Sequence, residues 1–197
     1  MAAKQRAHEV RIIGGKWKGR KLRFRGDDSL RPTLGRTRET LFNWLRASLP
    51  DMRCLDLFAG SGVLGFEALS QGAGHCTFVE QNRQTLAQLR ANAEMLAANP
   101  QCQIVGGDAR RFLQRQTQPF DLVFLDPPFH NSTLLAQACD TLCDNRLLGG
   151  YLYAESDSLP RLLQLADRDQ LQVVRQTRSG SAHGVLFETS TDNNTGH

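Results

Sequence analysis

From residue 52 onward, short apolar runs typical of strands alternate with segments whose apolar residues recur at helical spacing. The strand candidates are 52–58, 75–80, 102–105, 120–126 and 150–155. The helix candidates are 62–71, 82–98, 108–116, 132–144 and 158–167. This alternation predicts βαβ units, and therefore a mostly parallel sheet with helices on its faces.

The last two strand candidates, 170–177 and 184–189, are joined by a short segment rich in serine and glycine. Such a connection is typical of a hairpin, so we expect the sheet to end in an antiparallel pair. The predicted fold is a Rossmann-like, doubly wound α/β sheet whose last strand is antiparallel. In sheets of this kind, ligands bind outside the carboxyl ends of the strands.

The first 50 residues follow a different pattern. Residues 10–24 are predicted to form two short strands around Gly14 and Gly15, 25–35 a loop, and 36–49 an amphipathic helix. The chain is therefore divided into a basic N-terminal arm or hairpin, a main domain and a frayed tail, at residues 1–28, 29–190 and 191–197.

Length and composition exclude several classes of protein. The chain has 197 residues, which suits one domain, and 40% hydrophobic with 22% charged residues is typical of a globular protein. No apolar run is long enough to span a bilayer, and the N-terminus carries no secretory signal. The five cysteines cannot all pair and form no CxxC motif. We expect a cytoplasmic protein with reduced thiols and no membrane partner.

Positive charge is concentrated at the N-terminus. Residues 1–46 hold 13 lysines and arginines but four acidic residues, a net charge of +9, whereas the remainder carries −5. All four lysines lie within the first 21 residues. A basic segment on a mildly acidic body predicts a polyanionic partner, and apolar residues interleaved with these charges argue against a merely solvated tail.

The first predicted strand of the main domain ends in a glycine-rich turn. Asp56 is followed by Gly60, Gly62 and Gly65, and glycines allow a tight turn and the close approach of a ligand to the backbone. The second strand ends in Glu80, whose carboxylate suits the two hydroxyls of a ribose. This spacing fits both NAD and S-adenosylmethionine.

Two more strand ends carry polar residues. Asp108 follows the third strand, and it suits either a helix N-cap or an adenine amino group. The fourth strand ends in Asp126-Pro127-Pro128-Phe129. Two prolines fix a stiff turn with outward carbonyls, while the aspartate adds an acceptor and the phenylalanine a flat apolar face. This combination predicts a planar substrate that bears an NH2 group.

Together these strand-end motifs resemble the class I S-adenosylmethionine-dependent methyltransferases. The Asp-Pro-Pro-Phe tetrapeptide resembles the motif of those that methylate amino nitrogens. Segments 11–22 and 30–45 look like the RsmD family of bacterial methyltransferases, which modify guanine N2 in 16S ribosomal RNA. The resemblance covers roughly residues 10–190. It implies a seven-stranded sheet, S-adenosyl-L-methionine as cofactor, and 16S rRNA in the 30S subunit or an assembly intermediate as partner.

The resemblance also implies roles for single residues. The N-terminal element that closes over the cofactor, the glycine turn and the strand ends supply the predicted cofactor-binding residues, namely Thr33, Arg36, Arg38, Asp56, Phe58, Ala59, Gly60, Ser61, Gly62, Glu80, Asp108 and Ala109. Asp126 and the Pro127 carbonyl would accept hydrogen bonds from the guanine amine, Pro128 would stiffen the turn, and Phe129 would stack on the base.

The basic hairpin would then bind RNA phosphates. The predicted RNA-binding residues are Arg11, Lys16, Trp17, Lys18, Arg20 and Lys21. Trp17 has two interpretations, because its indole suits either stacking on a base or packing in the core. The chemistry requires no metal, and a monomer is the default expectation.

Three alternatives remain open from the residues. The first is an amino-methyltransferase that acts on DNA adenine or protein glutamine. The second is an NAD-dependent oxidoreductase, which the glycine spacing and Glu80 permit but which leaves the Asp126 motif unexplained. The third is a non-catalytic RNA-binding factor of ribosome assembly.

Overall fold

A computed structural model describes residues 7–25, 35–128, 132–168 and 171–189. Its main sheet has seven strands in the order β5-β4-β3-β6-β7-β9-β8. They span β3 (Arg53–Asp56), β4 (His75–Glu80), β5 (Cys102–Gly106), β6 (Phe120–Leu125), β7 (Leu148–Ser156), β8 (Leu171–Ser179) and β9 (Ala182–Thr189). Only β9 runs antiparallel to its two neighbours, so the predicted Rossmann-like sheet with an antiparallel last strand is confirmed.

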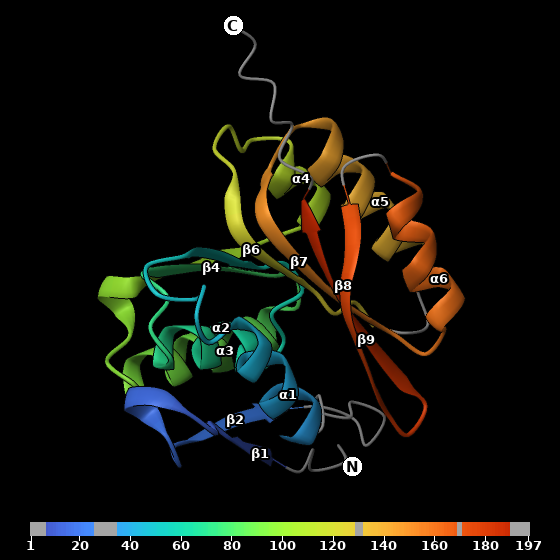
Figure 1. Ribbon diagram of the computed structural model, residues 1–197. Helices are drawn as coiled ribbons and strands as arrows, with labels where there is room; N and C mark the ends of the chain where they lie inside the picture. Colours follow the sequence, from blue (N-terminus) through green and yellow to red (C-terminus); the bar gives the residue numbers. More distant parts are fainter. Residues whose placement is uncertain (1–6, 26–34, 129–131, 169–170, 190–197) are drawn as a thin grey trace, which may run out of the picture.

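Helices cover both faces of this sheet (Figure 1). One face carries α1 (Gly35–Leu45), α2 (Val63–Ser70) and α3 (Arg83–Met95), and the other carries α4 (Ala109–Leu113), α5 (Ser132–Asp144) and α6 (Leu159–Leu163). Short 3-10 turns complete the chain at η1 (Gly15–Trp17), η2 (Asn99–Gln101) and η3 (Gln164–Asp167). The strand order reverses between β3 and β6, which places a ligand crevice at their carboxyl ends.

Alternation along the strands builds two cores. Cys54, Phe78 and Phe124 point toward α1, α2 and α3, whereas their strand neighbours Leu55 and Val123 point toward the opposite helices. The period of two follows from the pleat of a strand. Because both faces are buried, the strands are almost continuously apolar.

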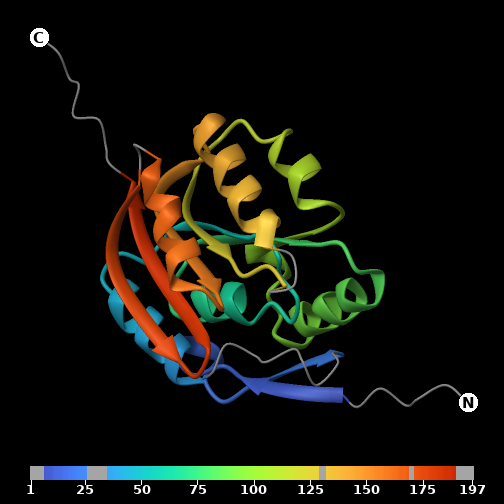
Figure 2. The same ribbon diagram turned by 90° about the vertical axis from the view of Figure 1, so that its right-hand side faces the viewer.

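The N-terminal hairpin forms a further layer outside α2 and α3 (Figure 2). Its strands are β1 (Ala7–Arg11) and β2 (Lys21–Arg25). The prediction of two strands meeting at Gly14 and Gly15 is therefore wrong in detail, since η1 and its flanks separate them. Trp17 is the cause, because this side chain is buried against α2 and its backbone N–H donates to Ser70 Oγ at 2.9 Å.

The hairpin shares its core with the helices. Its apolar side chains, Val10, Ile12, Trp17, Leu22 and Phe24, belong to the same buried cluster as α1, α2 and α3. The boundary proposed at residue 28 therefore does not separate two cores; residues 26–34 lie outside the described part of the chain, as does the tail at 191–197.

The helix predicted over 36–49 ends earlier than expected. α1 stops at Leu45, and a turn carries the chain to Leu49, which is still buried in the core. The N–H groups of both Ser48 and Leu49 bond to the Leu45 carbonyl, so the last turn tightens instead of continuing.

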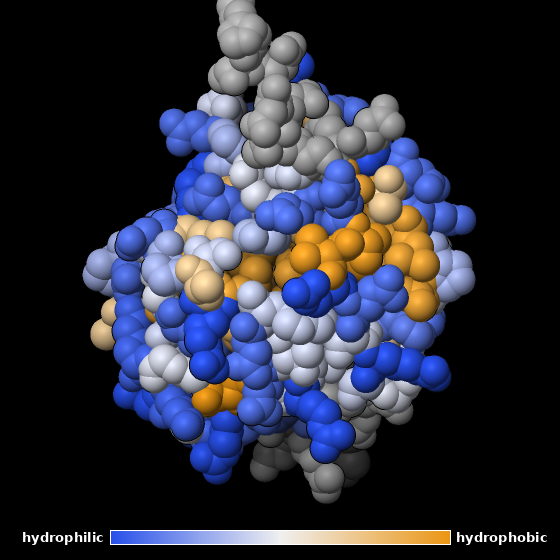
Figure 3. Space-filling model, viewed as in Figure 1, coloured by the Kyte–Doolittle hydropathy of each residue, from blue (hydrophilic) through white to orange (hydrophobic). Residues whose placement is uncertain are grey.

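Hydrophilic residues dominate the face shown in Figure 3, including the region over the hairpin and α1. Orange patches lie over β8 and α6, which carry the exposed side chains Val173 and Leu163. Within the described ranges, no helix is long and apolar enough to cross a membrane. All five cysteines are free thiols, and four of them are buried.

Candidate active site

The loop between β3 and α2 adopts a conformation that requires its glycines. Gly60 and Gly62 have φ angles of 52° and 77°, in the left-handed region that favours glycine. A Cβ on Gly62 would overlap Phe66 Cε2 at 2.6 Å, and a Cβ on Gly65 would lie 2.7 Å from Cys76 Sγ. Gly62 and Gly65 therefore serve close packing of α2 and its neighbours.

Gly60 differs from these two because, among the described residues, no side chain lies within 4 Å of a Cβ placed there. In the described part of the chain, the nearest atom to that Cβ is the Phe58 carbonyl oxygen at 3.9 Å, and a Cβ on Gly107 would meet no described atom within 4 Å. Gly107 follows β5, so two glycines without close contacts to the described residues lie along the strand-end edge.

Glu80 is held against this loop at the carboxyl end of β4. Its Oε2 accepts the N–H of Gly60 at 2.9 Å, and its Oε1 accepts the N–H of Asn82 at 2.7 Å. Asn82 in turn caps α3 by accepting the N–H groups of Gln84 and Thr85. These two bonds fix the carboxylate beside the glycine loop. Each carboxylate oxygen has a second lone pair, with which it could accept a hydrogen bond from a ribose hydroxyl.

Asp56 lies behind the loop instead of on its open side. The side chain is 3% exposed and accepts the N–H of Gly65 at 3.1 Å. The pKa of Asp56 is raised to about 8, mainly by burial; the nearby charges of Asp126 and Glu80 contribute to this rise, and the Gly65 bond opposes it. Asp56 therefore orders the loop and the start of α2.

Asp108 caps α4 by accepting the N–H of Arg111 at 2.9 Å. The capping alternative from the sequence therefore agrees with the structure. Ala109 is the first residue of α4 and is partly exposed beside this cap. Any contact of these two residues with adenine stays a prediction.

The Asp126 motif leaves the sheet at the carboxyl end of β6. β6 pairs with β3, which pairs with β4, so Asp126 follows a strand two positions from the one that ends in Glu80. Asp126 is partly exposed, Pro127 is buried and Pro128 is exposed. Phe129 lies outside the described residues, and so does Thr33 of the predicted cofactor set.

A buried pair on the next strand borders Asp126 and was missed in the sequence. Tyr153 in β7 donates its hydroxyl to Glu155 Oε1 at 2.7 Å, and both side chains are buried. Burial raises the pKa of Tyr153 well above its usual range, and the charges of Glu155 and Asp126 add to this. Polar residues inside the apolar run 150–155 were the available signal.

Arg38 occupies a position different from the one its predicted role suggests. Its guanidinium is 3% exposed, donates to the Arg11 carbonyl at 3.0 Å, and pairs with Glu67 at 3.4 Å. Burial lowers the pKa of Arg38, while the charges of Glu67 and Glu155 raise it. The side chain thus joins the hairpin to α2; contact with the cofactor stays a prediction, as it does for the exposed Arg36.

Glu67 anchors the hairpin and was also missed. This fully buried carboxylate of α2 accepts the N–H groups of Ile13 and Gly14, at 3.0 and 2.8 Å, together with a bond from Gln71. Burial raises the pKa of Glu67, whereas these bonds and Arg38 lower it. A charged residue within the apolar segment 63–69 was the signal for a buried anchor.

The predicted RNA-binding residues divide into two groups. Arg11, Lys16, Lys18, Arg20 and Lys21 are exposed along the hairpin, with Lys21 paired to Glu9 at 2.6 Å. Arg20 donates to the Met95 carbonyl at 2.6 Å and Lys16 to Gln101. The prediction that Trp17 stacks on a base is not supported, because its indole is 9% exposed and packs in the core.

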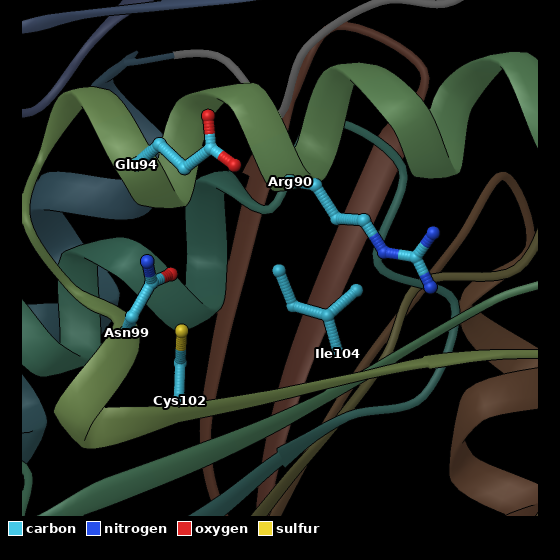
Figure 4. Close-up of a pocket in the computed structure, with 5 residues that line it drawn as sticks. All are labelled: Arg90, Glu94, Asn99, Cys102 and Ile104. Carbon is cyan, nitrogen blue, oxygen red and sulfur yellow. The ribbon is translucent and has the colours of Figure 1, made fainter.

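A surface hollow lies between α3 and β5, away from the strand-end motifs. Arg90 and Glu94 extend into it from α3, and Asn99, Cys102 and Ile104 line its other side (Figure 4). No predicted site residue lines it. Among the described side chains, no cluster of three or more His, Cys, Asp or Glu is arranged to hold a metal ion.

The doubly wound sheet of this chain is shared by solved structures described as methyltransferases. A solved Escherichia coli structure named "Putative methyltransferase yhhF" has a TM-score of 0.80 and 38% identity, and the match covers 92% of this chain and 98% of that one. A Haemophilus influenzae structure named "putative methylase HI0767" has a TM-score of 0.76 and 39% identity, and the match covers 92% of this chain and 99% of that one.

The chain belongs to the family described as Conserved hypothetical protein 95, whose family model matches residues 10–188. A relative from Haemophilus influenzae, "Ribosomal RNA small subunit methyltransferase D", is 47% identical over 154 residues, which are 76% of this chain and 79% of the relative. The protein of the same name from Escherichia coli is 44% identical over 151 residues, covering 76% and 75%. The resemblance to the RsmD family is thereby confirmed.

Proposed function

We propose that this protein transfers a methyl group from S-adenosyl-L-methionine to the exocyclic N2 amine of a guanine in 16S rRNA. Its substrate is the 30S subunit or an assembly intermediate, and it acts as a monomer in the cytoplasm, where ribosomal subunits are found. The names of the family members support the ribosomal substrate. The Asp-Pro-Pro turn supports an amino nitrogen as acceptor.

The observation that carries this proposal is the arrangement of three strand ends. β4, β3 and β6 are consecutive in the sheet, and they end in Glu80, Asp56 and Asp126. The loop that begins after Asp56 carries Gly60, whose open side borders the same edge. A cofactor held by Gly60 and Glu80 would therefore lie beside a base held at Asp126.

When bound, S-adenosylmethionine supplies an activated sulfonium methyl group, so the protein has mainly to position the attacking amine. An exocyclic guanine amine is a poor nucleophile because its lone pair is delocalised into the ring. Asp126 and the Pro127 carbonyl would accept its N–H groups and favour a pyramidal nitrogen. Correct placement of two reactants is itself worth several kcal/mol of the barrier, about 7–11 at best.

The target base must leave its stack to reach this edge. Sequence-specific enzymes that act on a base take it from a splayed or unpaired position. The exposed hairpin cations would hold the surrounding backbone through phosphate contacts, which are independent of sequence. Base selection is thus assigned to the Asp126 turn and general RNA affinity to the hairpin.

The proposal is tested with 30S subunits from a strain that lacks this protein. The subunits are incubated with tritiated S-adenosylmethionine, beside free 16S rRNA, DNA and total protein. We expect label in RNA that digests to N2-methylguanosine. Label in DNA or protein, or in another nucleoside, would refute the proposal that guanine N2 of 16S rRNA is the methyl acceptor. Cofactor binding without transfer to any of these would favour a non-catalytic assembly factor.

A further inference from the structure

Asn92 in α3 connects the hairpin to the glycine loop, which lies between β3 and α2. Its Oδ1 accepts the backbone N–H of Arg23 at 3.1 Å, and its Nδ2 donates to the Arg23 carbonyl at 2.9 Å. The same Nδ2 donates to the carbonyl of Ser61 at 3.2 Å. One side chain, 2% exposed, therefore binds β2 on one side and the loop between β3 and α2 on the other.

Other hairpin anchors do not reach this loop. Ser70 accepts the Trp17 N–H and donates to the Gly14 carbonyl, at 2.9 and 2.6 Å. Glu67 binds the N–H groups of Ile13 and Gly14. Ser70 lies in the last turn of α2, at the end opposite the glycine loop.

The packing around Asn92 favours transmission of small movements. Leu89 lies one turn earlier on the same face of α3, and its side chain occupies the space that a Cβ on Gly62 would need. α3 therefore touches the loop at both Ser61 and Gly62. The buried amide has its two N–H groups and its carbonyl oxygen engaged, so a displacement of β2 changes bonds at the loop as well.

We propose that Asn92 is a positioning residue that couples RNA binding on the hairpin to cofactor binding at the Gly60–Gly62 loop. This inference rests on the proposed function for the identity of the two ligands. Binding of either ligand strengthens binding of the other by the same factor, since coupling free energy is reciprocal. Without Asn92 the part of this coupling that passes from the hairpin through α3 to the loop is lost.

The test uses Asn92→Asp, with Ser70→Ala as the matched control. An aspartate keeps the acceptor for Arg23 N–H but cannot donate to the carbonyls of Arg23 and Ser61. Ser70→Ala also loses buried hairpin bonds but leaves the loop untouched. The probe is tritiated S-adenosylhomocysteine, which cannot donate a methyl group, and its Kd is measured with and without 30S subunits from the strain lacking this protein.

For the wild-type protein and Ser70→Ala we expect the subunits to tighten probe binding by about fivefold or more. For Asn92→Asp we expect a ratio clearly closer to one than in the wild-type protein. A wild-type ratio of one, an unchanged ratio in Asn92→Asp, or an equal loss in Ser70→Ala would overturn the inference. If Asn92→Asp does not fold, Asn92→Leu, which is similar in size and adds no buried charge, replaces it in the same assay.

The inference and the proposed function fail in different ways. A wild-type protein that methylates 30S subunits but shows no coupling retains the function and loses the role of Asn92. A protein that binds no S-adenosylhomocysteine, or transfers no methyl group to RNA, contradicts the proposed function itself.

Discussion

Acidic residues at neighbouring strand ends have different environments and therefore different uses. Glu80 is fixed by two backbone N–H groups and faces the glycine loop. Asp56 is buried behind that loop. Asp126 is partly exposed at the turn that follows β6. Of these three residues, we propose Glu80 and Asp126 as direct ligand contacts, while Asp56 supports the loop.

Asp126→Ala should abolish methyl transfer and leave RNA binding within a few-fold. The substitution removes one acceptor at the reacting amine, and loss of one preorganised polar group at a reacting centre costs about 100-fold or more in kcat. The measurement is single-turnover transfer to 30S subunits, with filter binding of the same RNA. Retained turnover with lost RNA binding would reverse the roles assigned to Asp126 and the hairpin.

Asp56→Asn should change how stability depends on pH. An aspartate in the unfolded chain titrates near 3.9, whereas burial raises the pKa of Asp56 to about 8 in the folded protein. The stability that the protonated carboxyl provides is thus present below pH 4 and is lost as the pH rises through about 8. Asparagine retains an oxygen for the Gly65 N–H but does not ionise.

Denaturant unfolding of both proteins between pH 5 and 9 checks this. We expect wild-type stability to fall relative to the variant, with a slope approaching about 1.4 kcal/mol per pH unit between pH 5 and 7. Parallel curves would show that the Asp56 carboxyl is already ionised in the folded protein.

Some of the elements around the site could be predicted from the sequence, and others could not. The strands and their ends were predictable because a period of two and the residues after each strand are local signals. The hairpin connection was not, because η1 forms where Trp17 enters the core beside Ser70. Its contacts are distant in sequence.

Contacts that are distant in sequence also limit the prediction of the buried polar residues that anchor the hairpin. The sequence predicted Glu80, Asp108 and the Asp126 turn at the correct edge of the sheet, but it offered no partner for Arg38. Glu67 and Asn92 each stand on an otherwise apolar helix face, which signals a buried polar residue without naming what it binds. The binding partners of these residues are defined only when the hairpin packs on α2 and α3.

Gly65→Ala should destabilise the packing of α2 on β4. A methyl group there would overlap the ring of Phe78 and lie 2.7 Å from Cys76 Sγ. Overpacking of a core typically costs about 1–3 kcal/mol in unfolding free energy. Gly35→Ala is the control, because at the start of α1 the nearest atom is Arg38 Nη2 at 4.0 Å. Equal stability of the two variants would contradict this account.

At the scale of the whole molecule, one segment provides both a positively charged surface and part of the apolar core. The N-terminal segment is the most basic part of the chain, yet its apolar residues are built into the main core. The cations are therefore presented on a fixed surface instead of a loose tail. A fixed surface binds phosphates without the entropic cost of ordering the segment.

Lys18→Gln should weaken RNA binding and make it less dependent on the salt concentration. Lys18 is exposed at the hairpin turn, and each phosphate contact contributes about 0.7–0.9 to the slope of log K against log salt. We expect the slope to fall by about that amount. Arg115→Gln, an exposed cation in the segment that connects α4 to β6, is the control and should leave the slope unchanged. An equal loss in both variants would indicate net charge alone.

The contact between Arg20 and Met95 has a consequence for substrate size. Arg20 binds Met95, the last residue of α3, whereas Glu80 lies before the other end of that helix, so the hairpin turn and the Glu80 end of the strand-end edge lie apart along α3. Under the proposed function, an RNA held at both places is a bivalent ligand on a rigid scaffold. The second contact then benefits from a high effective concentration, and an RNA too short to span the gap gains nothing from it.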